Sequence, residues 1–395
     1  FSYAPDMKHI LFVQRVKLDQ DIHDIHPDMP LANARIETDL MYRHWNAWAD
    51  GKYNHIFVQS LDANGIATGK AIDLMEGEPY HAPQMPFGGI EEITWSPDGK
   101  TIAYTSKKLQ GKASAFSTNS NIYTYSLESG ETRCLTGFNT GYDKCPQYSA
   151  DSSKLYWQSM EHDGYESDKN RLIVMNLSTE ERIDMTAELD QSVATLVWTP
   201  ASDGIYFTSV QHGMTQIYLC NIADKSFRQI TKGVHDYEQV ALAPNGLIGV
   251  RHSMSMPNEI YAINIETGDQ TQISHENEHI LSQLEMGKVE ERWMTTTDGK
   301  QMLVWVIYPP KFDASKKYPT LLYCEGGPQS PVSQFWSYRW NFQMMAANDY
   351  IIVAPNRRGL YGFGQEWLEA ISGDYGGQCM KDYLTAIDTF AKEPF

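Results

Sequence analysis

The chain has 395 residues, of which 42% are hydrophobic and 21% are charged, and its formal net charge is −18. The length favours two domains, and the composition is that of a globular protein with a sizeable core. Because phosphate binding depends on clustered Lys and Arg, the acidic balance argues against a nucleic-acid partner. No apolar run in the sequence approaches the roughly 20 residues that a membrane-spanning helix needs. The chain starts with Phe1 rather than Met, which is typical of a mature or trimmed chain.

The cysteines predict neither a metal site nor a dense disulfide framework. Their number is odd and their spacing matches no metal-ligand pattern, so we expect no metal ion and no cofactor. One local disulfide between Cys134 and Cys145 is an option in an oxidising compartment. The alternative is that the thiols are buried and act as small hydrophobic groups. The five cysteines are Cys134, Cys145, Cys220, Cys324 and Cys379.

A turn motif recurs along the first part of the chain. Its clearest copy is WSPDGK at residues 95–100, followed by the alternating stretch TIAYT. Pro presets φ for a turn, Asp caps it and Gly supplies a positive φ, so each copy predicts a β-hairpin. Further copies lie at residues 3–8, 148–154, 198–204 and 242–246.

Each copy is followed by a second pair of strand candidates, for example residues 121–126 with 131–136. Four strands per unit, at a period of roughly 40–50 residues, is the pattern of a β-propeller. We predict that residues 1–278 form this propeller, which is incomplete and has about five blades in the chain.

The first unit carries a long insertion between Val13 and Ile56. Its segment 35–50 is dense in aromatic and charged residues. Long insertions in tight blades are usually functional or disordered, and the Trp and Tyr content argues against disorder. Two interpretations stay open: a clasp that packs on the propeller rim, or a surface that faces a substrate.

From residue 279 the period breaks and a different pattern begins. A hairpin over residues 290–308 precedes two short apolar runs, 319–324 and 350–355, and each run ends in a Gly-rich turn. Residues 380–392 carry apolar positions at i, i+4, i+7 and i+11, which predicts an amphipathic helix. This order indicates an open α/β sheet with its loops gathered at the strand ends. Four further side chains are predicted to lie in the core: Trp336, Trp340, Met344 and Met345.

The two Gly-rich turns carry the most specific sequence in the chain. EGGPQS follows the first run, and NRRGLYGFGQEWLEAISGDYGG follows the second. A propeller followed by these blocks resembles the prolyl oligopeptidase family of serine peptidases, in its dipeptidyl-peptidase 5 and acylaminoacyl-peptidase branch. The resemblance covers essentially the whole chain, although SPDGK-type turns also occur in many non-enzymatic propellers. It implies that residues 279–395 are the N-terminal part of an α/β-hydrolase domain and that the chain is trimmed at both ends.

The chemistry implied by the resemblance is acyl transfer by a Ser-His-Asp triad, with the Ser in a G-x-S-x-G turn beyond the helix that ends this chain. No G-x-S-x-G occurs in the 395 residues. The triad is therefore expected outside them, none of the 12 His is expected to be catalytic, and the chain alone should be inactive.

One half of the oxyanion hole should be present. In such hydrolases a backbone N–H from the turn after the third strand helps to hold the tetrahedral oxygen. The matching turn is residues 325–328, and Gly326 is the expected donor. For Glu325 two interpretations stay open: it attracts the cationic N-terminus of a peptide, or it is a solvated or ion-paired turn carboxylate.

Arg357 and Arg358 follow the second strand on the same side of the predicted sheet. As substrate-binding residues, one of them would hold a carbonyl or carboxylate in bidentate fashion. The alternative is that they pair with Asp374 or Glu366 and pin their loop.

The resemblance leaves three functions to separate. A peptidase that releases dipeptides needs carboxylates that receive a free N-terminus, whereas an acylaminoacyl-peptidase takes blocked N-termini and needs none. A non-catalytic binding propeller is disfavoured, because it has no need for part of a hydrolase sheet. Glu91 and Glu92 resemble the paired glutamates of dipeptidyl peptidases, although their place beside a propeller turn favours a solvated face. The other candidates are the acidic Glu37, Asp39 and Asp50 and the aromatic Tyr42, Trp45 and Trp48.

We therefore expect peptide substrates. Bacterial relatives of this branch imply a periplasmic or secreted protein, and dimers in the family imply a homodimer as one possible assembly.

Overall fold

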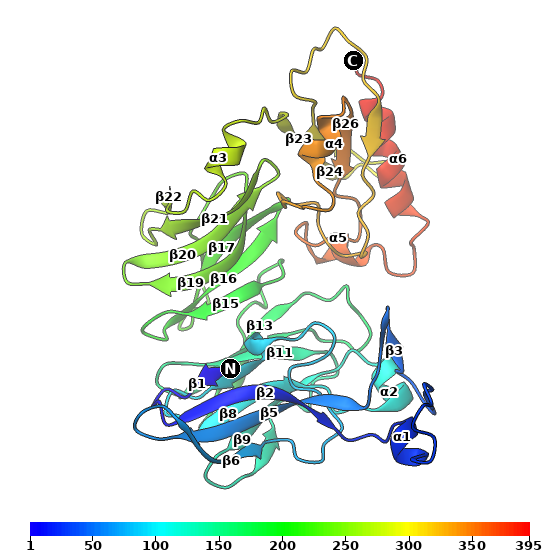
Figure 1. Cartoon of the computed structure of the whole chain (residues 1–395). Helices are drawn as coiled ribbons and strands as arrows, with labels where there is room; N and C mark the ends of the chain where they lie inside the picture. Colours follow the sequence, from blue (N-terminus) through cyan, green and yellow to red (C-terminus); the bar gives the residue numbers. More distant parts are fainter. The chain divides into compact units, whose positions relative to one another are not determined.

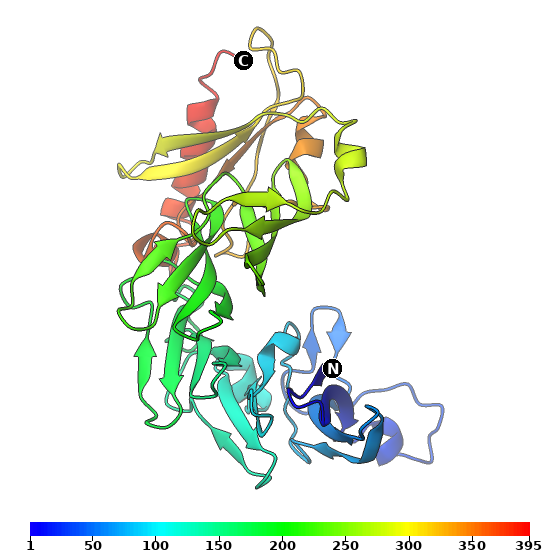
Figure 2. The same cartoon turned by 90° about the vertical axis from the view of Figure 1, so that its left-hand side faces the viewer.

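The computed structural model describes residues 1–395, which divide into two compact units (Figures 1 and 2). Unit 1 comprises Phe1–Tyr165 with Arg171–Asp184, and unit 2 comprises Glu166–Asn170 with Met185–Phe395. Both units are built mainly from four-stranded sheets. None of the helices is both long enough and apolar enough to cross a membrane.

Unit 1 holds three antiparallel sheets that pack face to face in sequence order. Leu11 and Trp95 belong to the core between the first two sheets, and Ala103 and Trp157 belong to the core between the second and third. The strands are β1 (Ser2–Tyr3), β2 (His9–Lys17), β5 (Lys52–Leu61) and β6 (Ala67–Asp73); β7 (Ile93–Trp95), β8 (Thr101–Ser106), β9 (Asn121–Ser126) and β10 (Thr132–Cys134); and β11 (Asp143–Tyr148), β12 (Lys154–Ser159), β13 (Arg171–Asn176) and β14 (Arg182–Asp184).

Unit 2 begins with two further sheets of the same kind, which share a core that includes Tyr206 and Tyr237. Consecutive antiparallel four-stranded sheets that stack face to face are the blades of a propeller, so the predicted architecture is confirmed with five blades. Their strands are β15 (Ala194–Trp198), β16 (Gly204–Gln211), β17 (Met214–Asn221) and β18 (Phe227–Gln229); and β19 (Asp236–Ala243), β20 (Gly246–Ser253), β21 (Met256–Ile263) and β22 (Gln270–Gln272).

All five copies of the turn motif join the first strand of a sheet to the second, as predicted. In the clearest copy the Ser96 hydroxyl donates to the Asp98 carboxylate at 2.6 Å and accepts from the Thr101 N–H at 2.9 Å. Gly99 has a φ of +71°, a conformation that glycine adopts without strain. In this copy the residues of the turn itself thus supply the hydrogen bonds and the glycine conformation that close the hairpin.

The insertion leaves the first blade intact. Val13 pairs with Ile56 across β2 and β5. The inserted residues 18–51 connect Lys17, the last residue of β2, to Lys52, the first residue of β5. They form α1 (Ile22–Ile25) and a short hairpin of β3 (Arg43–His44) and β4 (Ala47–Trp48). Unit 1 also contains η1 (Ile90–Glu92) and α2 (Gly111–Phe116).

The remainder of unit 2 is built around a mixed sheet with the order β23-β24-β26-β25. The predicted hairpin forms β23 and β24, β24 is antiparallel to β26, and β25 is parallel to β26. A helix connects the two parallel strands, as expected for an α/β unit. The strands are β23 (Val289–Thr295), β24 (Gln301–Ile307), β25 (Thr320–Leu322) and β26 (Ile351–Pro355).

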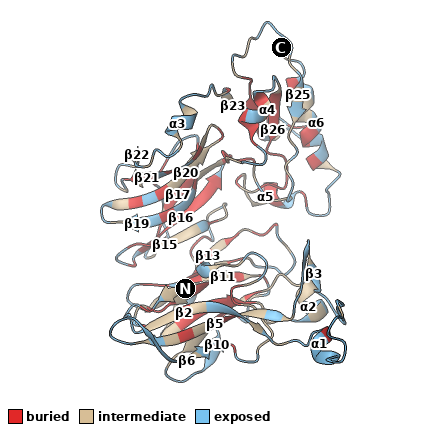
Figure 3. Ribbon diagram, viewed as in Figure 1, coloured by how far each residue is buried: buried red, intermediate tan, exposed pale blue.

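Alternate residues of the central strands face two hydrophobic cores. Trp305 and Ile352 lie in the core that includes Phe342 of α4 (Phe342–Ala346). Val304 and Val353 lie in the core that includes Phe390 of α6 (Gln378–Phe390). Figure 3 shows the buried faces of both helices and of β26. Two further helices complete the chain: α3 (Glu278–Leu281) before the sheet and α5 (Gln365–Glu369) after it.

The predicted amphipathic helix is present as α6, displaced by two residues toward the N-terminus. The core prediction for Met344 and Trp340 was wrong, because their exposed fractions are 69% and 49%. The helix α4 is short, begins only at Phe342 and buries Phe342 and Ala346 instead. The boundary between residues 278 and 279 stays a prediction; the last blade ends with β22 and the mixed sheet begins with β23.

Candidate functional site

The two Gly-rich turns lie at the same edge of the mixed sheet. The parallel strands β25 and β26 are in register at Leu322 and Val353, and the Tyr323 N–H donates to the Val353 carbonyl at 2.9 Å. Residues that follow parallel strands gather at one edge, where ligands of α/β proteins bind. The sheet topology thus brings residues 325–328 close to residues 356–359.

Gly326 is exposed at this edge, and a Cβ atom added to it would meet no atom within 4 Å. The turn is therefore open to solvent at this residue. The carbonyl of the preceding residue, Glu325, is held from the inside: Arg357 Nη2 donates to it at 3.0 Å and Tyr383 Oη at 2.9 Å. Arg357 and Tyr383 are both buried.

The Glu325 side chain is half-buried and turns back on its own turn. Burial raises the pKa of the Glu325 carboxyl, and this effect outweighs the hydrogen bonds from the Tyr323 hydroxyl and the Gly326 N–H and the charge of Arg357, which all lower it. Burial and this hydrogen bond also raise the pKa of the Tyr323 phenol. Neither interpretation of Glu325 is decided by this environment, and its role in binding a peptide N-terminus stays a prediction.

Arg358 is buried and forms ion pairs with two carboxylates. Its Nη1 and Nη2 atoms each lie 2.6 Å from an oxygen of Asp298, a bidentate arrangement, and its Nε atom lies 3.2 Å from Asp382 Oδ2. The guanidinium also lies 4.4 Å from the centre of the Trp367 ring. These contacts anchor the loop after β26, and they engage the donor atoms that a substrate carboxylate would need.

The partners of Arg358 differ from those that sequence reasoning named. Asp374 accepts from the backbone N–H of Gln378 at 3.1 Å, and Glu366 pairs with Lys300. Burial raises the pKa of Asp382, although its hydrogen bonds and Arg358 act in the opposite direction.

Sequence reasoning missed Asp298, Asp382 and Tyr383 altogether. Asp298 belongs to a turn of the common propeller type, TDGK, which gave no reason to expect a distant partner. Asp382 and Tyr383 are adjacent on α6, and both are buried. An aspartate on the buried side of an amphipathic helix is the one signal that could have identified them.

The insertion brings together part of its candidate set. The rings of Tyr42 and Trp48 are stacked with centroids 6.0 Å apart, and the guanidinium of Arg35 lies 5.5 Å from the Trp48 ring. Trp45 is 72% exposed and contacts Phe87 edge to face at 5.4 Å. Of the acidic candidates in the insertion, Glu37 and Asp39 are exposed, and Asp50 pairs with Arg15 at 2.6 Å.

The adjacent glutamates Glu91 and Glu92 have different environments. Glu91 is exposed, whereas Glu92 is buried and accepts from the backbone N–H of Gln84 at 2.7 Å. Burial raises the pKa of Glu92 to about 7, with a smaller contribution from Glu91. The expectation of a solvated face was thus wrong for Glu92. A buried carboxyl that titrates near neutral pH is the kind of group found in functional sites.

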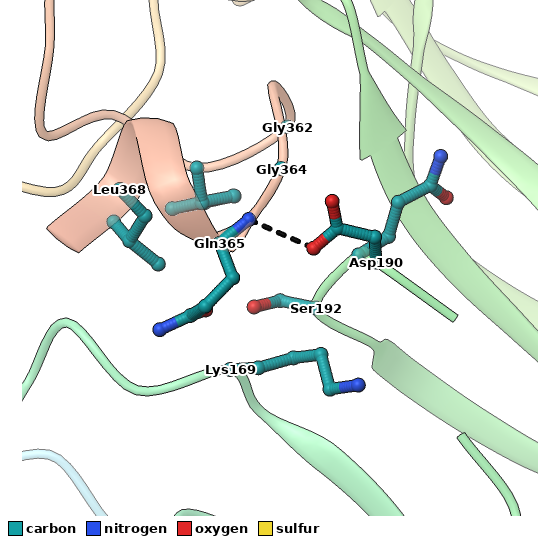
Figure 4. Close-up of a pocket in the computed structure, with 9 residues that line it drawn as sticks. Lys169, Asp190, Ser192, Gly362, Gly364, Gln365 and Leu368 are labelled. Carbon is teal, nitrogen blue, oxygen red and sulfur yellow. Dashed lines mark hydrogen bonds between the residues drawn. The ribbon is translucent and has the colours of Figure 1, made fainter. Parts of the chain in front are cut away.

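The hollow in Figure 4 has a structural role. It has a volume of about 10 Å³, which is room for one water molecule. The Asp190 carboxylate accepts from the backbone N–H of Gln365 at 2.8 Å, and so caps the start of α5. The Lys169 ammonium donates to the carbonyls of Thr186 and Leu189. These contacts join the start of the fourth blade to the loop after β26 within unit 2.

The cysteines form no disulfide. Cys134 is exposed and Cys145 is half-buried, and burial raises the pKa of Cys145 to about 12. The local bridge considered for this pair is therefore absent. The structure contains no group of three or more His, Cys, Asp or Glu side chains that could hold a metal ion.

Two protein families match the chain, one in the region of the propeller blades and one in the region of the mixed sheet. Residues 89–280 match the TolB beta propeller domain, and residues 336–395 match the prolyl oligopeptidase family. The chain is 47% identical over its full length to dipeptidyl-peptidase 5 of Porphyromonas gingivalis and 45% identical to that of Porphyromonas endodontalis. It spans 57% of the length of each of these curated relatives.

Solved structures support the fold. An acylaminoacyl peptidase in complex with Z-Gly-Gly-Phe-chloromethyl ketone superposes with a TM-score of 0.75 at 19% identity, and the match covers 98% of this chain and 55% of that one. An acylaminoacyl peptidase of Pyrococcus horikoshii gives a TM-score of 0.74 at 18% identity, over 99% of this chain and 56% of that one. The chain thus combines a TolB-type propeller with a region, residues 336–395, that matches the prolyl oligopeptidase family, and it is similar over its full length to two dipeptidyl-peptidase 5 proteins.

Proposed function

We propose that the intact protein is a serine peptidase that releases dipeptides from the free N-terminus of oligopeptides, and that this chain supplies one oxyanion-hole donor, the N–H of Gly326. The observation that carries the proposal is the exposed position of Gly326 at the strand edge of the mixed sheet. The similarity to two dipeptidyl-peptidase 5 proteins supports the same activity.

The chemistry is acyl transfer. A Ser activated by His and Asp attacks the scissile carbonyl, and the negative charge that develops on the carbonyl oxygen is stabilised by preorganised N–H donors. No G-x-S-x-G turn occurs in the 395 residues, so this chain would contribute a donor and not the nucleophile. The chain alone would then be inactive.

The free N-terminus of the substrate requires a carboxylate. Among the candidates, Glu325 directly precedes Gly326 and lies in the same unit. Glu37 and Asp39 remain candidates because they are exposed, and Tyr42, Trp45 and Trp48 offer exposed aromatic surface for apolar side chains. Glu92 is a poorer candidate, because it is buried and accepts a hydrogen bond from Gln84 within the chain. Arg357 and Arg358 are poorer candidates for substrate binding, because both are buried and occupied by contacts within the chain.

A fluorophosphonate probe and two fluorogenic substrates test the activity of the intact protein. We expect labelling of one serine and release of aminocoumarin from a dipeptidyl-aminocoumarin amide with a free N-terminus, but not from its N-acetylated form. Cleavage of the acetylated form alone would replace the proposal with an acylaminoacyl-peptidase. If the protein is not labelled and cleaves neither substrate, the peptidase proposal fails and the alternative of a non-catalytic binding propeller is favoured.

Two substitutions at one position test the oxyanion donor. Gly326→Pro removes the N–H, and loss of one oxyanion donor lowers kcat by roughly 10²–10³-fold. Gly326→Ala keeps the N–H and meets no atom within 4 Å, so it should retain activity within a few-fold. Equal activity in the two variants would show that the Gly326 N–H does not stabilise the transition state.

For location and assembly we propose a periplasmic or secreted protein that can form a homodimer, on the basis of the bacterial peptidase relatives. Cell fractionation followed by light scattering of the purified protein tests both parts. Recovery in the cytoplasmic fraction, or a monomer at all concentrations, would contradict the corresponding part.

A further inference from the structure

The carbonyl oxygen of Glu325 receives two hydrogen bonds from the protein interior. Arg357 Nη2 lies 3.0 Å from it and Tyr383 Oη lies 2.9 Å from it. The two donors also contact each other, because Arg357 Nε donates to Tyr383 Oη at 3.1 Å. Their side chains come from different elements, the loop after β26 and helix α6, and converge on this one oxygen.

The direction of the Gly326 N–H follows from this arrangement. The peptide bond between Glu325 and Gly326 is trans, so its C=O and N–H point in opposite directions. With the carbonyl drawn inward, the N–H must point outward, where Gly326 is exposed. Rotation of this peptide unit would turn the N–H away from the open side and break both inward hydrogen bonds.

The partners of Arg357 are unusual for a buried guanidinium. Arg357 is 3% exposed, and its hydrogen bonds go to the Glu325 carbonyl, the Arg358 carbonyl and the Tyr383 phenol, which are all uncharged. The neighbouring Arg358 instead pairs with two carboxylates. Burying a cation is unfavourable unless hydrogen bonds compensate. Two of the compensating acceptors here are backbone carbonyls, so Arg357 is a link between the turn at Glu325 and the loop after β26.

The N–H also affects a carboxyl group of this chain. The Gly326 N–H lowers the pKa of the Glu325 carboxyl, which means that it favours a negative charge beside it. The same N–H would favour the negative charge on the oxygen of a tetrahedral intermediate.

We propose that Arg357 and Tyr383 are positioning residues of the oxyanion hole, which hold the Glu325–Gly326 peptide unit so that its N–H points at the reacting carbonyl. The inference rests on the proposed function of Gly326. It assigns Arg357 a task within the chain instead of a contact with substrate, and it adds Tyr383 to the residues on which catalysis depends.

Tyr383→Phe in the intact protein is the direct test. The variant keeps the ring and loses one of the two donors to the Glu325 carbonyl. We expect kcat to fall roughly 10-fold, a part of the 10²–10³-fold effect of losing an oxyanion donor outright. KM should change less than twofold, since substrate binding in the ground state does not use the tetrahedral oxygen.

Inhibitor affinity separates positioning from a general structural role. A dipeptide boronate, which binds as a tetrahedral adduct, should lose about the same factor as kcat, whereas a product dipeptide should bind unchanged. Tyr308→Phe is the matched control, because Tyr308 is also buried and accepts from an arginine, Arg292, at 2.7 Å in the same unit. It should leave kcat and boronate affinity unaltered.

Arg357→Lys supplies a second variant. It keeps the charge, but an ammonium cannot reproduce the fork of donors that joins Tyr383 to two carbonyls, so the loss in kcat should be equal or larger. If wild type is active and Tyr383→Phe retains kcat and boronate affinity within twofold, the positioning role is refuted while the proposed function stands. If wild type reacts with neither substrate nor fluorophosphonate, the proposed function itself fails.

Discussion

Two turns of nearly the same sequence have different roles in the two units. Residues 96–100 (SPDGK) close the second blade of unit 1, and residues 296–300 (TTDGK) close the β23–β24 hairpin of unit 2. In each turn a hydroxyl donates to the aspartate, at 2.6 Å for Ser96 and 2.5 Å for Thr296. In each the glycine has a positive φ, +71° at Gly99 and +84° at Gly299.

The two turns differ in the hydrogen-bond partners of their aspartates, because only Asp298 contacts a residue from a distant part of the chain. The pKa of Asp98 is lowered first by the Ser96 hydroxyl, a contact within its own turn. The pKa of Asp298 is lowered first by hydrogen bonds from Arg358, which lies 60 residues away in sequence. The same local chemistry thus forms a simple hairpin in one unit, and in the other an anchor for the loop beside the candidate site.

Of the substitutions that test this difference between the turns, Arg358→Met should lower the free energy of unfolding most. The substitution removes the cation and leaves Asp382, which is fully buried, without its ion pair. Loss of one partner of a buried pair destabilises by about 3–5 kcal/mol. Denaturant unfolding of the intact protein, with hydrogen exchange to locate the change in unit 2, measures it.

Arg133→Met serves as the control, because Arg133 pairs with Glu180 at the surface, where ion pairs contribute about 0–1 kcal/mol. A loss below 1 kcal/mol in Arg358→Met, similar to that of the control, would mean that Arg358 does not anchor the loop.

An intermediate effect is expected when each turn loses its aspartate charge. Asp298→Asn removes a charged hydrogen-bond acceptor of Arg358, worth about 1.5–3 kcal/mol, whereas Asp98→Asn removes only a local acceptor, worth about 1 kcal/mol. Chemical denaturation of both variants gives the two values, and a double-mutant cycle with Arg358→Met isolates the coupling. A coupling energy near zero would contradict the ion pair.

The pH dependence of the Asp298 effect has a defined sign. Because Arg358 lowers the pKa of Asp298 in the folded protein, the stabilisation is present above the ordinary value of 3.8 and is lost as the pH falls below it. The difference between wild type and Asp298→Asn should therefore shrink below about pH 4. A difference that grows on acidification would show that the charged form is not the stabilising one.

The smallest effect should be the same in both turns. Gly99→Ala and Gly299→Ala each place a Cβ at a positive φ, which costs roughly 1–2 kcal/mol, and neither added Cβ approaches another atom closely. Thermal unfolding should give equal losses for the two variants. Unequal losses would show that the turns differ in backbone conformation as well as in their distant partner.

Much of the fold could be predicted because its signals are local. The turn at residues 95–100 gives its Pro, Asp and Gly within six positions, and α6 shows its apolar period over three turns. The core prediction for Met344 and Trp340 failed because burial there depends on contacts that are not local. Their helical spacing gave no information on which side of the five-residue helix α4 meets the sheet. For the candidate site, the turn with Gly326 was identified from its motif and its place after a strand, whereas the residues that surround it were not.

The sequence by itself determined the blades, the two Gly-rich turns and the absence of a G-x-S-x-G motif, since each depends on residues a few positions apart. Only the tertiary structure decided that Glu92 is buried, that Arg358 pairs with Asp298 and Asp382, and that Arg357 and Tyr383 hold the Glu325 carbonyl. These contacts join residues between 24 and 60 positions apart in different elements, or depend on burial by distant segments. Their energies come from desolvation and from the geometry of several donors and acceptors at once, which no pattern along the chain encodes.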